Sequence, residues 1–199
     1  EDSYVPTGMR DFDSRNGGIT YESLFVIGGT SGGGKSALAN QLALNWARMG
    51  LNVLVVPLEM SKRETMGRIL ANRSGIDIRK ILFQRLTENE KKIVVKKYKK
   101  YVRKANAKKG VYNIFKPEGD MSIEEILSVA NIFTPKIVVI DYISLLKGVS
   151  GEDQWQKLGT VARYAKQWAA ANKTIVVLLA QVSEDGHIRY SQAIKENAD

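Results

Sequence analysis

The chain has 199 residues, of which 44% are hydrophobic and 26% charged, a balance typical of one folded globular domain. Because it contains no cysteine and only one histidine, the sequence excludes a disulfide framework, a zinc site built on those residues and a cysteine nucleophile. The formal net charge is +9, and no apolar run is long enough to span a bilayer. The chain begins without methionine and without a signal peptide, so we expect an excerpt of a longer protein.

The first specific motif along the chain is GTSGGGKS, at residues 29–36. An apolar run at 24–28 predicts a strand before it, and residues 36–49 predict a helix after it that ends at Gly50. In this context G-x-x-x-x-G-K-[ST] predicts a phosphate-binding loop, or Walker A motif, for ATP or GTP. The side chains of Lys35 and Ser36 would meet the β/γ-phosphates and Mg²⁺. The nucleotide-binding residues expected are Gly29, Thr30, Ser31, Gly32, Gly33, Gly34, Lys35 and Ser36.

Strands and helices alternate through the rest of the chain. The strands are nearly continuous apolar runs, as in parallel sheets that are buried on both faces. Several helices begin with a Ser or Thr that is followed three residues later by Glu, which is the capping-box pattern. A parallel sheet of this kind binds ligands at the carboxyl ends of its strands. Strands are expected at 52–58, 111–115, 136–140 and 174–180, and helices at 61–72, at 77–83, from 87 onward, at 122–133 and at 156–171.

Three polar residues stand at the ends of apolar strands. Asp141 follows the run IVVI, which is the Walker B arrangement of an acid that holds Mg²⁺ directly or through water. Glu59 follows NVLVVPL and could act as the general base that polarises a water, although spacing alone equally allows an exposed Glu before a helix. Gln181 follows TIVVLLA and could sense the γ-phosphate, or be a plain polar residue at a strand end.

The basic character of the chain is concentrated in residues 91–109. This segment holds 10 of the 30 Lys and Arg residues and no Asp or Glu, so the remainder of the chain is nearly neutral. A charge run of this kind is most often a solvated helix face, and the alternative is a non-specific contact with phosphates. Apolar residues recur at helical spacing within it and predict one face packed on the core: Val94, Tyr98, Tyr101, Val102 and Ala105.

Four segments in this order resemble the RecA-like motor domain of DnaB-type replicative helicases, with the phage branch closest. They are GTSGGGKS, PLEMS at 57–61, IVVIDYISLL at 137–146 and LLAQ at 178–181. The resemblance implies an α/β fold, a RecA-like P-loop NTPase core with a mostly parallel sheet and helices on both faces. It also implies an N-terminal strap or linker at 1–20 and an ATPase domain at 21–199, whose last strands and arginine finger would lie beyond this chain.

The same resemblance implies the chemistry of the site. Glu59 would be the catalytic carboxylate, Gln181 the γ-phosphate sensor, and Lys35 the catalytic cation on the phosphates. Ser36 and Asp141 would hold Mg²⁺. ATP and Mg²⁺ are therefore the expected nucleotide and metal cofactor.

The resemblance further implies an ATP-dependent DNA helicase that translocates on single-stranded DNA and unwinds duplex. Arg189, Tyr190 and Ser191 match part of a DNA-binding loop of this family. The expected partners are single-stranded DNA, further copies in a ring that is a hexamer in the full-length protein, primase and a helicase loader. The expected location is the cytoplasm of a bacterial cell or of a phage-infected host, with no membrane association.

Two alternatives remain open from the residues alone. One is another ATPase of the same fold, such as a strand-exchange recombinase or a clock-type ATPase, which would form a helical filament or a double ring. The other is a non-catalytic, nucleotide-gated module that binds DNA or loads a helicase. A nucleotide or small-molecule kinase fits poorly, because no arginine-rich lid follows Asp141.

Overall fold

The structure is a computed structural model that describes residues 3–141, 143, 148, 154–181 and 197–199. Its centre is a five-stranded sheet with the order β3-β7-β6-β4-β5, in which every pair of neighbouring strands is parallel. The strands are β3 (Ser23–Gly29), β4 (Asn52–Pro57), β5 (Val111–Ile114), β6 (Ile137–Asp141) and β7 (Ile175–Gln181). The parallel sheet predicted from the apolar runs is thus confirmed.

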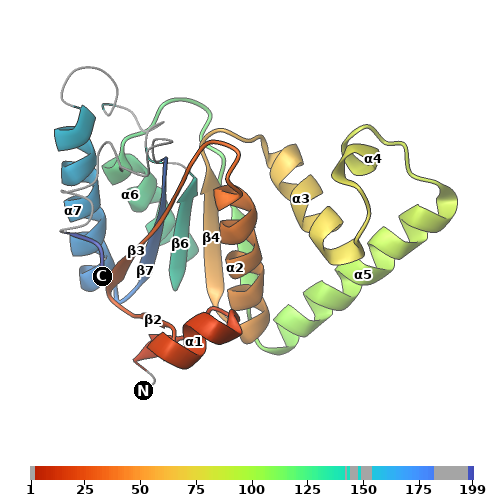
Figure 1. The fold of residues 1–199 in the computed structure, drawn as a ribbon, viewed down its shortest axis with the longest axis horizontal. Helices are drawn as coiled ribbons and strands as arrows, with labels where there is room; N and C mark the ends of the chain where they lie inside the picture. Colours follow the sequence, from red (N-terminus) through yellow and green to blue (C-terminus); the bar gives the residue numbers. More distant parts are fainter. Residues whose placement is uncertain (1–2, 142, 144–147, 149–153, 182–196) are drawn as a thin grey trace.

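Helices cover both faces of this sheet (Figure 1). Along β4, Val53 and Val55 pack against α2 (Lys35–Met49), whereas Leu54 and Val56 pack on the opposite side against α6 (Ile123–Phe133) and α7 (Gln154–Asn172). This alternation follows from the two-residue period of a strand. Each strand therefore contributes to two separate hydrophobic cores, and the sheet is held in place from both sides.

Local capping signals place the helix ends. Capping boxes begin α3 (Lys62–Ser74) at Ser61, α5 (Glu88–Ala107) at Thr87 and α6 at Ser122. Gly50 ends α2 in the left-handed region at φ 109°. Every helix and strand expected from residue 24 onward is present, and the bounds differ by at most two residues.

The helices α3, α4 (Ile78–Leu82) and α5 project to one side of the sheet beyond α2, at the right of Figure 1. The apolar face expected on α5 is confirmed, because Val94, Tyr101 and Ala105 are buried. The Tyr101 hydroxyl donates a hydrogen bond of 3.2 Å to the Leu44 carbonyl of α2. The guanidinium of Arg73 lies 5.5 Å from the centre of the same ring. These contacts attach the long helix to the core.

The first twenty residues, expected as a strap, contain elements that the sequence did not predict. Strands β1 (Tyr4–Val5) and β2 (Ile19–Thr20) pair antiparallel, with α1 (Arg10–Asn16) between them. The Pro6 carbonyl accepts a 3.0 Å hydrogen bond from the indole N–H of Trp46. These elements are too short for a periodic pattern to identify, and contacts with α2 hold them in place. The division into a strap and an ATPase domain stays a prediction.

The outer edge of β3, the end strand of the described sheet, is bonded to Asp199. Leu24 donates its N–H to the Asp199 carboxylate and accepts from the Asp199 N–H, each at 3.0 Å. The same carboxylate forms a 2.6 Å ion pair with Lys166 of α7. Among the described residues, no helix combines the length and the apolar character that crossing a bilayer requires.

Candidate functional site

The phosphate-loop motif forms a tight turn between β3 and α2. Gly32 and Gly34 adopt φ values of 71° and 84°, in the left-handed region that favours glycine. At Gly33 the constraint is space, because a Cβ atom would lie 3.0 Å from the Thr30 carbonyl oxygen and from its hydroxyl. The Gly33 N–H donates to the same carbonyl at 3.1 Å. Glycines at these positions therefore allow a loop that larger residues would distort.

The amino end of α2 has the properties of an anion site. No side chain caps it, and its first turn contains no acidic residue. Its N–H groups and the positive end of the helix dipole are therefore available to an anionic ligand. The Lys35 ammonium donates a 2.8 Å hydrogen bond to the Thr30 carbonyl, which places its charge over the loop. Backbone donors and a lysine cation on one loop suit a polyphosphate.

Asp141 is the last residue of β6 and is only 7% exposed. Burial raises the pKa of its carboxyl group, because a low-dielectric environment disfavours the charged form. A hydrogen bond from the Ser36 side chain and the positive charges of Lys35 and Arg68 oppose that rise in pKa, while the charge of Glu59 adds to it. The carboxylate and the hydroxyl thus lie side by side in one narrow crevice, although about a hundred residues separate them in sequence.

This pair of oxygen donors suits Mg²⁺. Hard divalent cations prefer carboxylate and hydroxyl oxygens, and Mg²⁺ characteristically completes its shell with phosphate oxygens and water. The part of the chain that the structure describes contains no group of three or more His, Cys, Asp or Glu residues able to hold a metal. A metal held by Ser36 and Asp141 would therefore depend on a bound phosphate for further ligands.

The strand order brings the three strand-end residues together. Because β6 lies between β4 and β7, Asp141 is in register with Pro57, two residues before Glu59. Gln181 is in register with Gly29, the first residue of the loop. Glu59 and Gln181 are both exposed. The structure thus gathers the loop, both acids and Gln181 at the carboxyl edge of the sheet, as the sequence predicted.

Two further residues of this edge escaped the sequence analysis. The Lys116 ammonium donates a short hydrogen bond to the Leu58 carbonyl, and the Leu58 N–H donates at 2.7 Å to the Asp141 carbonyl, so the residue before Glu59 is held on both sides. Lys116 follows β5 closely, and the strand-end rule used for Glu59 could have identified it. Arg68 of α3 lines a narrow crevice with Ser36 and Asp141, and no sequence signal pointed to it.

The DNA-binding residues expected from the sequence, Arg189, Tyr190 and Ser191, lie outside the described residues. Their role stays a prediction. The same holds for the roles assigned to the nucleotide-binding and strand-end residues, whose positions are described above.

The sequence is similar to known replicative helicases. The family described as DnaB-like helicase C terminal domain matches residues 4–193. The replicative DNA helicase DnaB of Nostoc sp. (strain PCC 7120) is 26% identical over 186 residues, which is 90% of this chain and 20% of that protein. DnaB of Geobacillus stearothermophilus is 24% identical, over 98% of this chain and 45% of the relative. A probable plasmid replicative DNA helicase of Chlamydia muridarum is 25% identical, over 90% and 39% respectively. The chain thus spans less than half the length of each of these curated relatives.

Two solved structures share the fold. One is an ATPase domain that superposes with a TM-score of 0.83 and 23% identity, over 100% of this chain and 75% of that one. The other is a DnaB-like replicative helicase, studied with its interactions with primase, which also gives a TM-score of 0.83 at 23% identity, over 98% of this chain and 50% of its own. These similarities confirm the predicted RecA-like ATPase fold. Whether the phage branch is the closest stays a prediction.

Proposed function

The chain belongs to the DnaB-like helicase C-terminal domain family, and from this membership we propose that it is the ATP-hydrolysing motor domain of a ring-shaped replicative DNA helicase. The observation that carries the proposal is the position of Ser36 next to the buried Asp141, in one crevice beside the uncapped end of α2. In P-loop ATPases this Ser–Asp combination holds the metal of the bound nucleotide.

ATP is the nucleotide proposed for the loop. Backbone N–H groups of residues 29–36 would surround the β-phosphate, and the Lys35 ammonium would leave the Thr30 carbonyl to contact the β/γ-phosphates. Ser36 and Asp141 would hold Mg²⁺, which supplies charge neutralisation to the phosphates when bound. Burial of Asp141 suits this role, because a cation restores the electrostatic stabilisation that the carboxylate loses on leaving water.

Glu59 is the general base of the proposed hydrolysis. Its carboxylate would accept a proton from the water that attacks the γ-phosphate, and ADP and phosphate would leave. The anchoring of Leu58 on both sides supports this assignment, because it limits the movement of the turn that carries Glu59. Gln181, at the end of the strand beside the phosphate loop, would hydrogen-bond the γ-phosphate. Loss of that phosphate would alter the segment that follows β7.

The motor would act on single-stranded DNA, bound through Arg189, Tyr190 and Ser191. It would assemble as a ring, a hexamer in the full-length protein, with an arginine finger supplied by the neighbouring subunit. Primase is a proposed partner because one solved relative of the same fold is known by its interactions with primase, and a helicase loader is another. The proposed location is the cytoplasm of a bacterial cell or of a phage-infected host, where such a helicase meets its DNA.

The test is ATP hydrolysis by the purified protein with and without single-stranded DNA. We expect DNA to stimulate hydrolysis, Lys35→Ala to abolish nucleotide binding, and Glu59→Gln to lower kcat by roughly 10²–10⁴-fold with ATP affinity retained. A silent Glu59→Gln variant with tight ATP binding would favour the nucleotide-gated module instead. Filaments or double rings in electron micrographs would favour a recombinase or a clock-type ATPase.

A further inference from the structure

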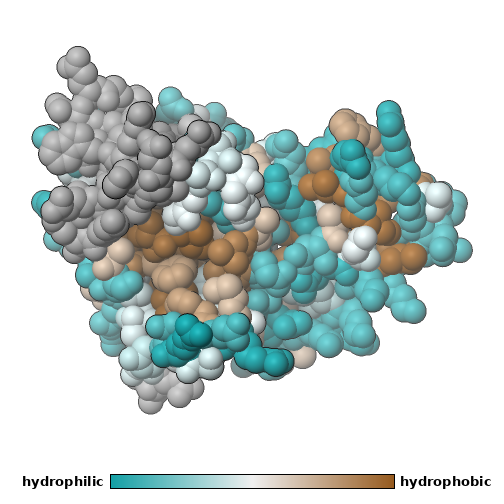
Figure 2. Space-filling view, viewed as in Figure 1, coloured by the Kyte–Doolittle hydropathy of each residue, from teal (hydrophilic) through white to brown (hydrophobic). Residues whose placement is uncertain are grey.

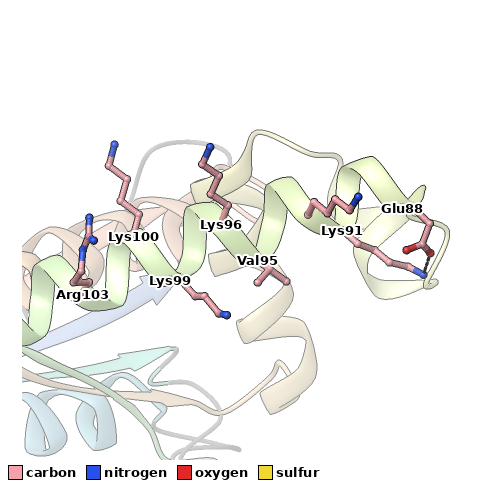
Figure 3. A pocket seen from close by; sticks show the side chains of 8 residues that line it. Glu88, Lys91, Val95, Lys96, Lys99, Lys100 and Arg103 are labelled. Atoms are coloured by element: carbon pink, nitrogen blue, oxygen red, sulfur yellow. Dashed lines mark hydrogen bonds and ion pairs between the residues drawn. The ribbon is translucent and has the colours of Figure 1, made fainter.

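On one face of α5, the central positions are all occupied by Lys or Arg. Lys92, Lys96, Lys99 and Arg103, here called the basic stripe, recur at positions i, i+4, i+7 and i+11, which places them within about 60° of arc on a helix of 3.6 residues per turn. The buried residues of α5, Val94 and Tyr101 among them, lie on the opposite side. The stripe lines an open hollow of about 810 Å³. Figure 3 shows Lys96 and Arg103 projecting from one side of the helix and Lys99 from the other, so the stripe follows the face between them.

The charges of the stripe are not neutralised within the described parts of the chain. The acids of α5 are at its amino end, where Glu88 pairs with Lys91 at 2.6 Å and Glu90 with Lys80 at 2.5 Å. None of the four stripe residues forms an ion pair with any residue that the structure describes. Like charges at i, i+4 spacing destabilise a helix. Helix faces that alternate the sign of their charges avoid this repulsion, and the stripe does not alternate.

An extended polyanion bound to the stripe would relieve this repulsion. The residues around the stripe indicate whether that polyanion is an acidic protein or a nucleic acid. Protein–protein interfaces are centred on apolar and aromatic residues and are depleted in lysine. Among the described residues, the hollow is lined by one apolar side chain, that of Val95, which is 50% exposed, beside cations and the already paired Glu88. Nucleic-acid interfaces are, in contrast, strongly positive and polar. Figure 2 shows the surface over α5 as largely hydrophilic.

We propose that the basic stripe binds the phosphate backbone of duplex DNA without reading its sequence. Proteins that hold single strands combine cations with aromatic platforms for the bases. Among the described residues no aromatic lines this hollow, and Tyr98, which shares a second hollow with Lys99 and Arg103, is half-buried. The stripe is about 16 Å long at 1.5 Å per residue, which is roughly half of a 34–36 Å duplex turn. A row of flexible cations of this length fits contacts along one stretch of duplex backbone.

This surface is separate from the nucleotide site. The Arg103 end of the stripe lies near the carboxyl half of α2, where Tyr101 bonds the Leu44 carbonyl. The phosphate loop is at the opposite, amino end of α2. Duplex binding by α5 therefore requires neither ATP nor the strand on which the proposed motor moves. The two surfaces can be tested independently.

The test compares two variants with equal charge. The first replaces Lys92, Lys96, Lys99 and Arg103 by Gln. The control replaces Lys97, Lys104, Lys108 and Lys109 by Gln, since these cations are exposed but lie off the stripe on the same segment. Gln has nearly the helix propensity of Lys and Arg, so both proteins should fold, as checked by thermal unfolding. Binding is measured without nucleotide by fluorescence anisotropy, using a labelled duplex, the same single strand and an acidic poly-Glu peptide over a range of salt.

We expect the stripe variant to lose at least tenfold in duplex affinity at about 0.1 M salt and to flatten the salt dependence by about 0.9 for each phosphate contact removed. The control variant should keep most of its duplex affinity and of its salt dependence. ATP binding should be unchanged in both variants. Equal losses in the two variants, or none in the stripe variant, would overturn the proposal. Tighter binding of the single strand or of the poly-Glu peptide than of the duplex, abolished by the stripe substitutions, would also overturn it and assign the surface to that partner. Failure of ATP hydrolysis alone would bear only on the function proposed above.

Discussion

Replacing Asp141 by Asn should stabilise the protein while it abolishes ATP hydrolysis. The carboxylate is 7% exposed at the end of β6, and its pKa is raised mainly by burial. An amide of the same shape avoids the cost of burying a charge and can still accept the hydrogen bond from Ser36. Because a neutral amide is a much weaker ligand for Mg²⁺, the same change should remove the metal site.

The expected gain follows from this balance of charges. Lys35 and Arg68 already offset part of the cost of burying the carboxylate. The substitution should therefore raise the free energy of unfolding by about 0.5–2 kcal/mol, the usual gain from a stabilising substitution. For a domain of this size each kcal/mol raises Tm by about 2–4 °C. The comparison variant Asp141→Ala also removes the oxygen that accepts a hydrogen bond from the Ser36 hydroxyl. It should therefore show no gain in the free energy of unfolding.

The assay is urea unfolding of both proteins, without nucleotide, as a function of pH. Because the folded pKa of Asp141 lies above its ordinary value of 3.8, the folded wild type binds this proton more tightly than the unfolded chain does. The wild type should therefore have a lower free energy of unfolding than the Asn variant. This difference should be largest above the raised pKa and should disappear as the pH drops towards 3.8. An Asn variant less stable than the wild type at pH 7 would refute the reasoning, because Lys35, Arg68 and Ser36 would then outweigh the burial.

Three further predictions follow from single contacts. Lys116→Met should lower kcat for ATP roughly ten- to hundredfold with KM nearly unchanged, since the turn before the proposed base loses its anchor; an equal rise in KM would assign the residue to nucleotide binding. Gly110→Ala should destabilise by at least about 1–3 kcal/mol in urea unfolding, because its Cβ would lie 1.7 Å from the Ala47 carbonyl oxygen, whereas Gly119→Ala meets nothing within 4 Å and should be nearly neutral. Burial raises the pKa of Tyr101 to about 12 from 10.0, so the free energy of unfolding should fall as the pH rises from 10 towards 12, by roughly 1–3 kcal/mol, and Tyr101→Phe should flatten that fall.

Most of the fold could be predicted because its signals are local. The capping boxes at Ser61, Thr87 and Ser122 depend on residues three positions apart, and each begins a helix. The phosphate loop needs only glycines, a lysine and a serine between a strand and a helix. The strands β1 and β2 were missed because two residues each cannot show periodicity, and their packing against α2 comes from residues far along the chain.

The sequence by itself determined which residues stand at strand ends and which face of α5 is apolar, since both depend on near neighbours in the chain. Only the tertiary structure decided which strand ends meet. Pairing of Pro57 with Asp141, and of Gly29 with Gln181, joins segments that local patterns cannot align. The position of Ser36 next to Asp141 and the hydrogen bond from Lys116 to Leu58 follow from that strand order. The physical reason is that propensity and capping act over a few residues, whereas strand order is selected by burial of the whole sheet between its two layers of helices.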